Sequence, residues 1–361
     1  MCLVDMSCAL CTVLGRRTEP TTYLFPSTPD MGMLLSEVLA QHGVSFEPRA
    51  NLIALSDLRD PSRVVALLRQ ILSEPERRDL TMFQSDGREF PRPRSLDDWW
   101  QVHHTGWFAS ALSADRFTTW FQPIVDTNAH LPLGYECLIR LETDRTYTGS
   151  EILAAARLHD EISAFDSYAR CLAIRSAARQ SPSGHYFINF LPSATYNAQS
   201  CLRATMNTLA ACNMSPENIV FEAVGCDPGS GPEHLRRICD YYRSEGFGFA
   251  LDNVGTGAHS LQTVSNLRPD YIKLDRHLVG NAEEPVCAAT IRRLVEVAEQ
   301  LNIVVIATGV ERARTMENLW LLGVEYMQGY LFGRPAPQVF NLRWAGARPA
   351  AEETTAYSCV V

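Results

Sequence analysis

Lysine is nearly absent from this chain. Lys273 is the single lysine among 32 basic residues, and all the others are arginine. Genome base composition explains such a bias without any function. An ammonium group nevertheless does chemistry that a guanidinium does not, because its pKa shifts readily on burial. Lys273 is therefore the first residue that the sequence singles out.

An excess of basic residues is also missing. The formal net charge is −9 and the isoelectric point lies near 5.5, which excludes a generic basic surface for a nucleic-acid polymer. No apolar run reaches the ~18 residues that suggest a membrane span. The eleven cysteines are scattered, and the N-terminus lacks the basic start of a signal peptide. We therefore expect a cytoplasmic protein without a disulfide framework.

The length of 361 residues suits one large domain and a smaller module. Short apolar strands alternate with helical patterns near the N-terminus, with strands at Thr22–Phe25, Leu52–Leu55 and Leu80–Phe83. We expect this module to sense a signal or to bind a protein partner, and its lone CxxC motif at Cys8 and Cys11 is weak evidence for metal or redox chemistry. The expected segments are a small α/β module in residues 1–90, a linker and connecting helix in 91–112, a barrel in 113–345 and a disordered tail in 346–361.

The larger segment alternates β-rich apolar runs with longer helical runs. Eight strands in this rhythm predict a (β/α)8-type barrel. The expected strands are Phe117–Phe121, Gly134–Arg140, Tyr186–Phe190, Ile219–Ala223, Gly248–Asp252, Tyr271–Leu274, Val304–Ala307 and Tyr326–Gln328.

Polar side chains stand at the ends of these strands, where such a barrel places its chemistry. Carboxylates and amides at this density suit Mg²⁺ or Mn²⁺, and a lysine among them would balance a phosphate. Each residue alone would more often be an ordinary strand-end residue or a helix cap. Their joint placement predicts metal-assisted phosphate-ester chemistry or its remnant. The strand-end residues are Glu136, Asn189, Glu222, Asp252, Asn253, Lys273, Thr308 and Gln328.

The motifs of residues 117–337 resemble those of the EAL domain, the bacterial cyclic di-GMP phosphodiesterase barrel. The resemblance covers about 60% of the chain and implies a modified (β/α)8 barrel of the TIM type. The matching motifs, in the family's order, are Phe121-Gln122-Pro123-Ile124, Glu136-Cys137-Leu138 in place of EAL, Phe187-Ile188-Asn189, Phe221-Glu222, Leu251-Asp252-Asn253, Lys273-Leu274-Asp275-Arg276, Gly309-Val310-Glu311 and Gln328-Gly329-Tyr330.

The resemblance also implies a ligand and roles for individual residues. In the family, two divalent metals activate water that opens cyclic di-GMP to linear pGpG. By analogy, Mg²⁺ or Mn²⁺ would bind here, although weakly, and the protein would form a homodimer. The implied metal ligands are Glu136, Asn189, Glu222 and Asp252, with Lys273 and Glu311 in catalytic positions. The implied ligand-binding residues are Gln122, Glu136, Leu138, Arg140, Asn189, Asp252, Asp275, Arg276, Gln328 and Phe332.

Three positions depart from the family pattern. Asn253 replaces the second aspartate of a metal-binding pair, which removes one negative charge. Thr308 replaces a glutamate assigned as the general base, and losing a positioned base costs on the order of 10²–10⁴ in rate. Gly225 replaces a glutamate that steadies a loop. Because these groups act as one unit, any single loss could suffice.

We therefore expect a catalytically degenerate receptor that binds cyclic di-GMP with little or no hydrolysis. Two alternatives stay open. One is an active phosphodiesterase in which Glu311 or a rearranged loop replaces the missing groups. The other is a nucleotide-independent regulator whose barrel surface binds a protein.

Overall fold

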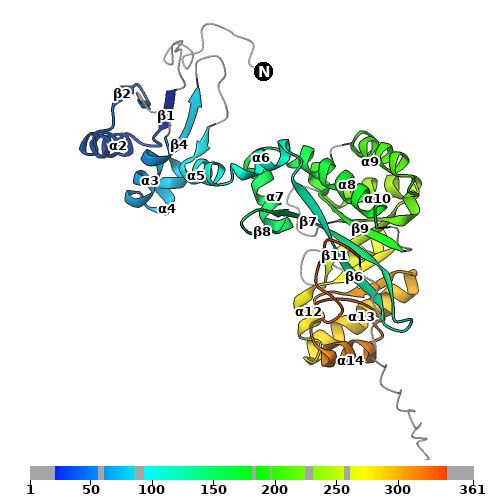
Figure 1. The fold of residues 1–361 in the computed structure, drawn as a ribbon. Helices are drawn as coiled ribbons and strands as arrows, with labels where there is room; N and C mark the ends of the chain where they lie inside the picture. Colours follow the sequence, from blue (N-terminus) through cyan, green and yellow to red (C-terminus); the bar gives the residue numbers. More distant parts are fainter. Residues whose placement is uncertain are drawn as a thin grey trace, which may run out of the picture. The chain divides into compact units, whose positions relative to one another are not determined.

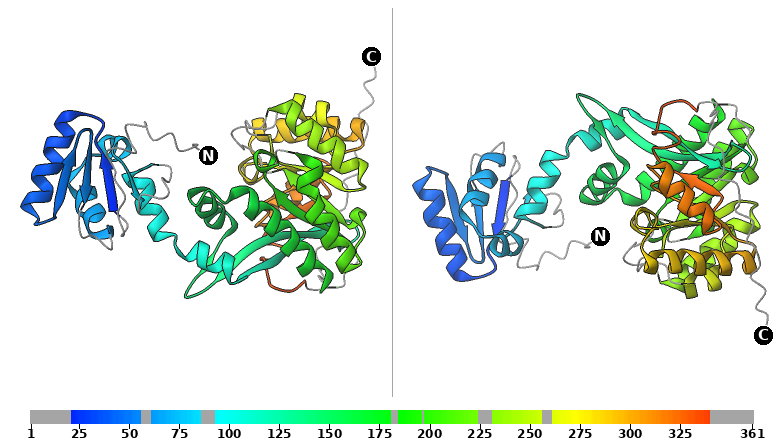
Figure 2. Two further views of the ribbon diagram at one scale, coloured as in Figure 1. Left: turned by 90° about the horizontal axis from the view of Figure 1, so that it is seen from above. Right: turned by 90° about the horizontal axis from the view of Figure 1, so that it is seen from below.

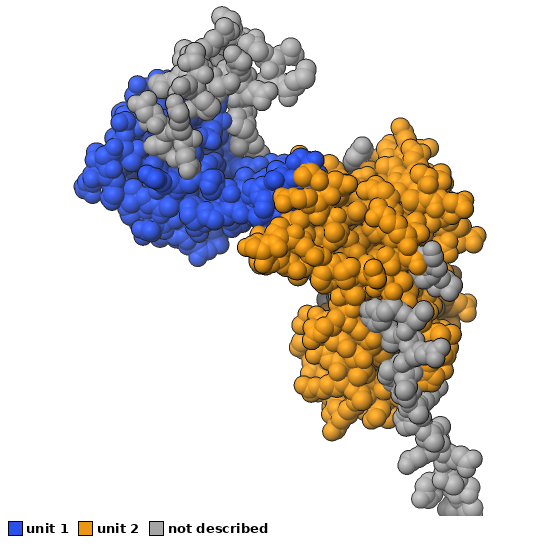
Figure 3. All heavy atoms as spheres, in the orientation of Figure 1, with its two compact units in different colours: residues 1–113, 157–160 blue, residues 114–156, 161–361 orange. Residues whose placement is uncertain are grey.

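The computed structural model describes residues 21–55, 61–85, 93–180, 184–195, 197–223, 231–255 and 261–339. The expectations for Cys8, Cys11, Gly225 and the C-terminal tail fall outside these residues. Two compact units divide the chain (Figure 3). One unit takes in residues 1–113 and 157–160, and the other takes in residues 114–156 and 161–361.

The first unit contains a five-stranded antiparallel sheet in the order β2-β3-β1-β4-β5. Helices cover one face, where Leu35, Val65 and Leu96 pack against strand residues such as Ile53 and Met82. Its elements are β1 (Thr21–Phe25), α2 (Pro29–Gln41), β2 (Phe46–Arg49), β3 (Leu52–Leu55), α3 (Ser62–Ile71), α4 (Glu74–Asp79), β4 (Thr81–Ser85), β5 (Arg94–Ser95), α5 (Leu96–His104) and α6 (Trp107–Ser113).

Two of these strands were not expected from the sequence. β2 and β5 are four and two residues long, and none of their residues is fully buried, so they lack an apolar signal. The sequence also predicts one helix over Asp97–Leu112, whereas the structure has two. The hydroxyl of Thr105 donates to the carbonyl of Gln101 at 2.8 Å, which caps α5, and Gly106 follows. A side chain that bonds the backbone next to a glycine ends the helix there.

The second unit is a closed barrel of eight strands surrounded by helices (Figures 1 and 2). The short strand β8 extends the sheet beyond β7. Its elements are β6 (Phe117–Asp126), β7 (Leu131–Glu142), β8 (Thr146–Tyr147), α7 (Gly149–Leu158), α8 (Ile162–Ala178), β9 (His185–Phe190), η1 (Pro192–Ala194), α9 (Ala198–Cys212), η2 (Pro216–Asn218), β10 (Ile219–Ala223), α10 (Pro232–Ser244), β11 (Gly248–Val254), α11 (Leu261–Leu267), β12 (Tyr271–Leu274), α12 (Arg276–Gly280), α13 (Pro285–Leu301), β13 (Val304–Ala307), α14 (Ala313–Leu321) and β14 (Tyr326–Gln328).

All eight strands expected from the sequence are present, and the predicted modified (β/α)8 fold is confirmed. The modification lies in the first strand. β6 forms a hairpin with β7 and also runs antiparallel to β14, while the other neighbouring strands that close the barrel are parallel. The carboxyl ends of β7 and β9–β14 therefore lie at one mouth, together with the start of β6. No helix among the described residues is long and apolar enough to cross a bilayer.

Strand residues alternate between two apolar layers. Phe121, Ile188 and Phe221 point outward into the core shared with the surrounding helices. Ile124, Phe187 and Val220 point inward and fill the lower barrel. Because side chains alternate between the two faces of a strand, the polar strand-end residues occupy the inward positions nearer the mouth.

Candidate functional site

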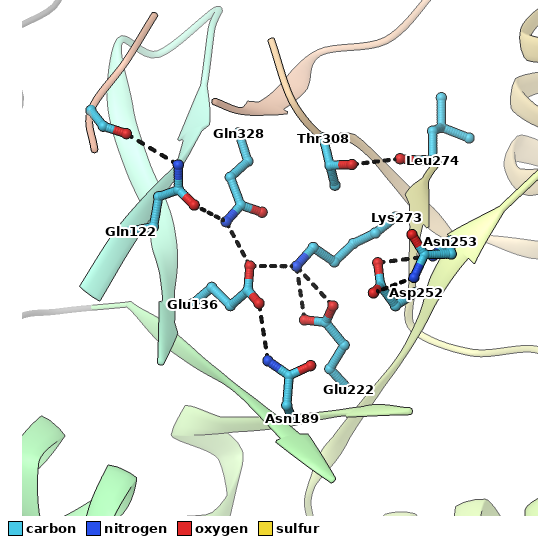
Figure 4. Close-up of polar contacts among 11 residues, drawn as sticks. Gln122, Glu136, Asn189, Glu222, Asp252, Asn253, Lys273, Leu274, Thr308 and Gln328 are labelled. Atoms are coloured by element: carbon cyan, nitrogen blue, oxygen red, sulfur yellow. Dashed lines mark hydrogen bonds and ion pairs between the residues drawn. The ribbon is translucent and has the colours of Figure 1, made fainter. Parts of the chain in front are cut away.

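The polar strand-end residues meet inside the barrel mouth (Figure 4). Several of them stand two residues after an inward apolar residue of their own strand, as Asn189 follows Phe187 and Glu222 follows Val220. Lys273 follows Tyr271 in the same way. Because every second side chain of a strand faces the barrel interior, these residues lie together in one ring at the mouth.

Lys273 is the centre of this ring. Its Nζ lies 2.8 Å from Glu136 Oε2 and 2.8 and 2.9 Å from the two carboxylate oxygens of Glu222. The side chain of Lys273 is 2% exposed and that of Glu222 is fully buried. A buried charge needs a partner, and here one ammonium serves two carboxylates.

The two carboxylates experience different environments. Burial raises the pKa of Glu222 well above its usual value, although Lys273 opposes the rise. Burial also acts to raise the pKa of Glu136, but Lys273 and hydrogen bonds from Gln328 and Asn189 outweigh it, so that pKa is lowered. Burial alone would lower the pKa of Lys273, yet the surrounding carboxylates raise it. The ammonium thus stays charged.

Two glutamines and Asn189 complete the ring. Asn189 Nδ2 donates to Glu136 Oε1 at 3.0 Å, and Gln328 Nε2 donates to Glu136 Oε2 at 2.7 Å. Gln328 Nε2 also lies 3.2 Å from Gln122 Oε1. Gln328 is 3% exposed, and its Oε1 has no hydrogen-bond partner among the described residues. This oxygen can accept a hydrogen bond from a ligand or a water molecule.

The residue after Gln328 has no room for a side chain. A Cβ on Gly329 would lie 2.0 Å from the carbonyl oxygen of Val310. The backbone of Val310 bonds Gln328 O and Leu331 N at 3.0 and 3.1 Å. The loop after β13, which carries Thr308 and Glu311, is therefore fixed against the end of β14.

Asn253 makes its polar contacts with the neighbouring carboxylate. Its backbone N–H and its Nδ2 donate to the two oxygens of Asp252, each at 2.8 Å. The backbone φ of Asn253 is 56°, where asparagine is better tolerated than most side chains. β11 and β12 lose regular register between Leu251 and Val254, which accommodates this conformation. Asn253 therefore acts as a hydrogen-bond donor to Asp252 instead of supplying a second negative charge.

Thr308 also bonds the protein itself. Its Oγ1 donates to the carbonyl of Leu274 at 2.7 Å, which links the end of β13 to β12. Glu311, three residues later, is exposed and lies outside the hydrogen-bond network drawn in Figure 4. Neither side chain is placed as a base within the ring.

The remaining candidate ligand-binding residues lie outside the ring. Leu138 and Arg140 continue the inward side of β7 beyond Glu136 and are half-buried. Asp275 caps α12, with Oδ1 accepting from the backbone of His277 at 2.8 Å, and Arg276 is exposed. Phe332 is 5% exposed and packs in the outer core, so its ring is not open at the mouth.

Two aromatic residues near the mouth were not expected from the sequence. Trp120 stands opposite Leu138 in the β6–β7 pair, and Tyr330 is 49% exposed just after β14. The alternation along β6 would have found Trp120, because it lies two residues before Gln122. Tyr330 lies inside the quoted closing motif, but the motif itself does not indicate which aromatic residue is exposed.

The residues present fit one divalent cation better than two. Three carboxylates and the amide oxygen of Asn189 are hard donors of the type that Mg²⁺ and Mn²⁺ take. Lys273 already offsets one of the three negative charges, and two adjacent dications would need more charge than remains. Among the described residues, no group of three Asp, Glu, His or Cys side chains is spaced to hold an ion as it stands.

The fold is a closed barrel of eight strands with a ring of buried polar side chains at its mouth (Figure 4). Residues 106–335 match the model of the EAL domain, and the chain belongs to the EAL-domain family. The relatives support the assignment. The blue light- and temperature-regulated antirepressor BluF of Escherichia coli K12 is 28% identical over 218 residues, which are 59% of this chain and 53% of BluF.

A second relative carries the family activity in its name. The cyclic di-GMP phosphodiesterase PdeF of Escherichia coli K12 is 26% identical over 241 residues, which are 64% of this chain and 32% of PdeF. The chain thus spans about half of one curated relative and a third of the other.

A solved structure shares the barrel. The cyclic di-GMP-bound form of a standalone EAL protein from Vibrio cholerae O395 is 30% identical, with a TM-score of 0.58. The match covers 63% of this chain and 95% of that protein. Proteins related to this chain therefore include a cyclic di-GMP phosphodiesterase and an EAL barrel that holds the nucleotide.

Proposed function

We propose that this protein is a cyclic di-GMP receptor that binds the nucleotide at the barrel mouth with little or no hydrolysis. The observation that carries the proposal is that Thr308 and Asn253, which replace acidic residues of the family, both form hydrogen bonds within the protein. Thr308 donates to a backbone carbonyl, and Asn253 donates to Asp252. Neither supplies the charge or the base that hydrolysis through two metals requires.

The groups that would hold the ligand are retained. Arg140 donates one N–H to the carbonyl of Ile139 at 2.8 Å, and a guanidinium has five N–H donors, so others can bond a phosphate. Gln328 Oε1, which has no partner in the part of the chain that the structure describes, adds a buried acceptor beside the ring. Lys273 bonds both Glu136 and Glu222, so these two carboxylates share a cationic partner without a metal ion. Binding therefore does not need Mg²⁺ or Mn²⁺, and any cation at this mouth would bind weakly.

Binding and turnover are measured on the same protein. Calorimetry with cyclic di-GMP in the presence of a chelator should give a Kd in the micromolar range or tighter, and Arg140→Ala should weaken it at least tenfold. Incubation with Mg²⁺ or Mn²⁺ for several hours should give no pGpG by chromatography. Product that appears with the wild-type chain and disappears in Glu136→Ala would establish an active phosphodiesterase instead.

A restoration variant sharpens the test. The combination Gly225→Glu, Asn253→Asp and Thr308→Glu should produce pGpG if these three groups are all that hydrolysis lacks. Its matched control, Gly225→Glu with Thr308→Glu, keeps Asn253 and should form less product because it lacks the second aspartate.

A nucleotide-independent regulator is the second candidate. The observation in its favour is the name of one relative, since BluF is an antirepressor. This reading requires that the wild-type chain give no heat with cyclic di-GMP at high concentration. It also requires a co-purifying protein that survives Arg140→Ala. In this alternative the partner binds the surface of the barrel, whereas for the receptor we propose the N-terminal unit as the surface for a protein partner.

A further inference from the structure

We propose that Trp120, together with Arg140, forms a stacking platform for a purine base of the dinucleotide. The inference rests on the proposed function and adds a residue to its binding site. Phe117, Thr119 and Phe121 of β6 are buried on the outer side of the strand. Trp120 lies between the last two and therefore faces the opposite side, which is the side of Gln122.

The register of the β6–β7 hairpin places Trp120 beside the ring. Gln122 pairs with Glu136, and Trp120 pairs with Leu138, one inward pair closer to the carboxyl end of β7. Trp120 thus stands directly above the polar ring, at the level where a ligand would enter. Its side chain is half-buried.

The indole ring has a defined orientation. Its Nε1 donates to Glu142 Oε1 at 3.0 Å, and Glu142 lies on the same side of β7 as Leu138 and Arg140. The guanidinium carbon of Arg140 lies 5.8 Å from the centre of the Trp120 ring. An indole and a guanidinium held together offer two π surfaces, and nucleobases stack on both kinds.

A second aromatic–arginine pair follows β14, the other barrel neighbour of β6. The guanidinium carbon of Arg334 lies 4.1 Å from the centre of the Tyr330 ring. Trp120 with Arg140 and Tyr330 with Arg334 are thus two pairs that each combine a ring with a cation. A ligand that carries both planar bases and phosphates matches such pairs, because bases stack on their flat surfaces and phosphates bond guanidinium N–H groups.

The test compares three variants by calorimetry with cyclic di-GMP in chelator. Trp120→Leu keeps an apolar side chain but removes the π surface, and its Kd should rise about tenfold or more. Trp120→Phe keeps a stacking ring and should stay within about threefold of wild type. Tyr147→Leu is the matched control, since it also removes an arginine–aromatic pair, with Arg145 at 4.1 Å. Tyr147 pairs with Leu141, whose side chain lies on the opposite face of β7 from Leu138 and Arg140. The Kd of the Tyr147→Leu variant for cyclic di-GMP should therefore not change.

Fluorescence gives an independent readout. Stacking of guanine on Trp120 should quench part of the tryptophan emission on ligand addition, and Trp120→Phe should lose that part while still binding. If Trp120→Leu binds like wild type, or if the quench persists in Trp120→Phe, the platform is wrong and the proposed receptor stands. If the wild-type chain does not bind at all, both proposals fall. Should Trp120→Leu fail to fold, the quench in Trp120→Phe still decides.

Discussion

Two buried ionic networks in the barrel unit can be compared directly. The first joins Arg170 and Asp166 on α8, with Arg170 Nε 3.0 Å from Asp166 Oδ2. Arg170 also donates to Thr205 Oγ1 at 2.9 Å, and Asp166 accepts from the backbone of Leu191 at 2.9 Å. The second is the Lys273 ring at the mouth.

The networks differ in how completely their charges are matched. In the α8 network one cation meets one anion, and both are further bonded by neutral groups that belong to the fold. At the mouth, Lys273 serves Glu136 and Glu222, Asp252 adds a third carboxylate, and Gln328 Oε1 has no described partner. A balanced buried network fixes helices and strands, while an unbalanced one retains capacity for a ligand.

The largest effect is expected from Lys273→Ala. It leaves Glu136 and Glu222 without their cation, and breaking a buried pair typically costs about 3–5 kcal/mol. The raised pKa of Glu222 gives the sign of the pH dependence. A carboxyl group whose pKa is higher in the folded state favours folding below its unfolded pKa, and this contribution is lost as pH rises through the folded value. Urea unfolding should show that lowering the pH from 8 to 5 recovers part of the stability.

Divalent cations should distinguish this variant from wild type. Mn²⁺ should raise the melting temperature of Lys273→Ala more than that of the wild-type chain, because the freed carboxylates can take a cation. Lys273→Arg keeps the charge and serves as the control. If Mn²⁺ raises the melting temperature of all three proteins equally, the Lys273 network does not differ from the α8 network in its capacity for a ligand.

Arg170→Met should destabilise the barrel by about 3 kcal/mol through the uncompensated Asp166. Here no cation should rescue stability, and molecules that fold should bind cyclic di-GMP with unchanged Kd. Combining the change with Asp166→Asn should recover part of the loss. A changed Kd in the folded variant would show that the α8 network acts on the mouth.

A smaller effect is expected on binding from Asp252→Asn. Burial raises the pKa of Asp252, although Lys273 opposes the rise. In a receptor without metals its carboxylate repels the phosphates of the ligand, so the variant should bind about fivefold more tightly, as expected for one like charge removed at close range.

The pH dependence gives the same test on the wild-type chain. Lowering the pH from 8 to 5 should tighten binding as Asp252 takes up a proton, and the variant should lose that dependence. Weaker binding by Asp252→Asn in chelator would contradict the proposed use of the site.

The last effect is one on stability alone and is expected from Asn253→Ala. The change places alanine at a φ of 56° and removes the Nδ2 donor to Asp252, with a combined cost of about 1–2 kcal/mol. Asn253→Gly removes the same donor without the backbone strain, so thermal melting should place it between alanine and wild type. Equal melting temperatures for the two variants would mean that the left-handed backbone costs nothing here.

The sequence predicted more of the barrel than of the smaller unit. Barrel strands such as Ile219–Ala223 are apolar apart from one strand-end residue, here Glu222, and the expected bounds match those of β10. β2 and β5 exist only because a neighbouring strand supplies their hydrogen bonds, since Phe46 and Arg94 belong to runs that are not apolar enough to be recognised.

In the site, residue types were readable but contacts were not. Thr308 and Asn253 could be read as lost acidic groups, yet nothing in the chain order indicates that Thr308 bonds Leu274 or that Asn253 bonds Asp252. Phe332 shows the same limit, because a motif position does not say whether a ring faces the mouth or the core.

The amino-acid order alone determined the strand periods, the polar residue at each strand end and the single lysine. Closing the strands into a barrel decided which of those residues touch. Lys273 lies 137 residues from Glu136 along the chain and 2.8 Å from it in space. Local sequence sets which face a side chain takes, whereas electrostatic pairing between distant strands depends on the closed sheet that brings them within contact.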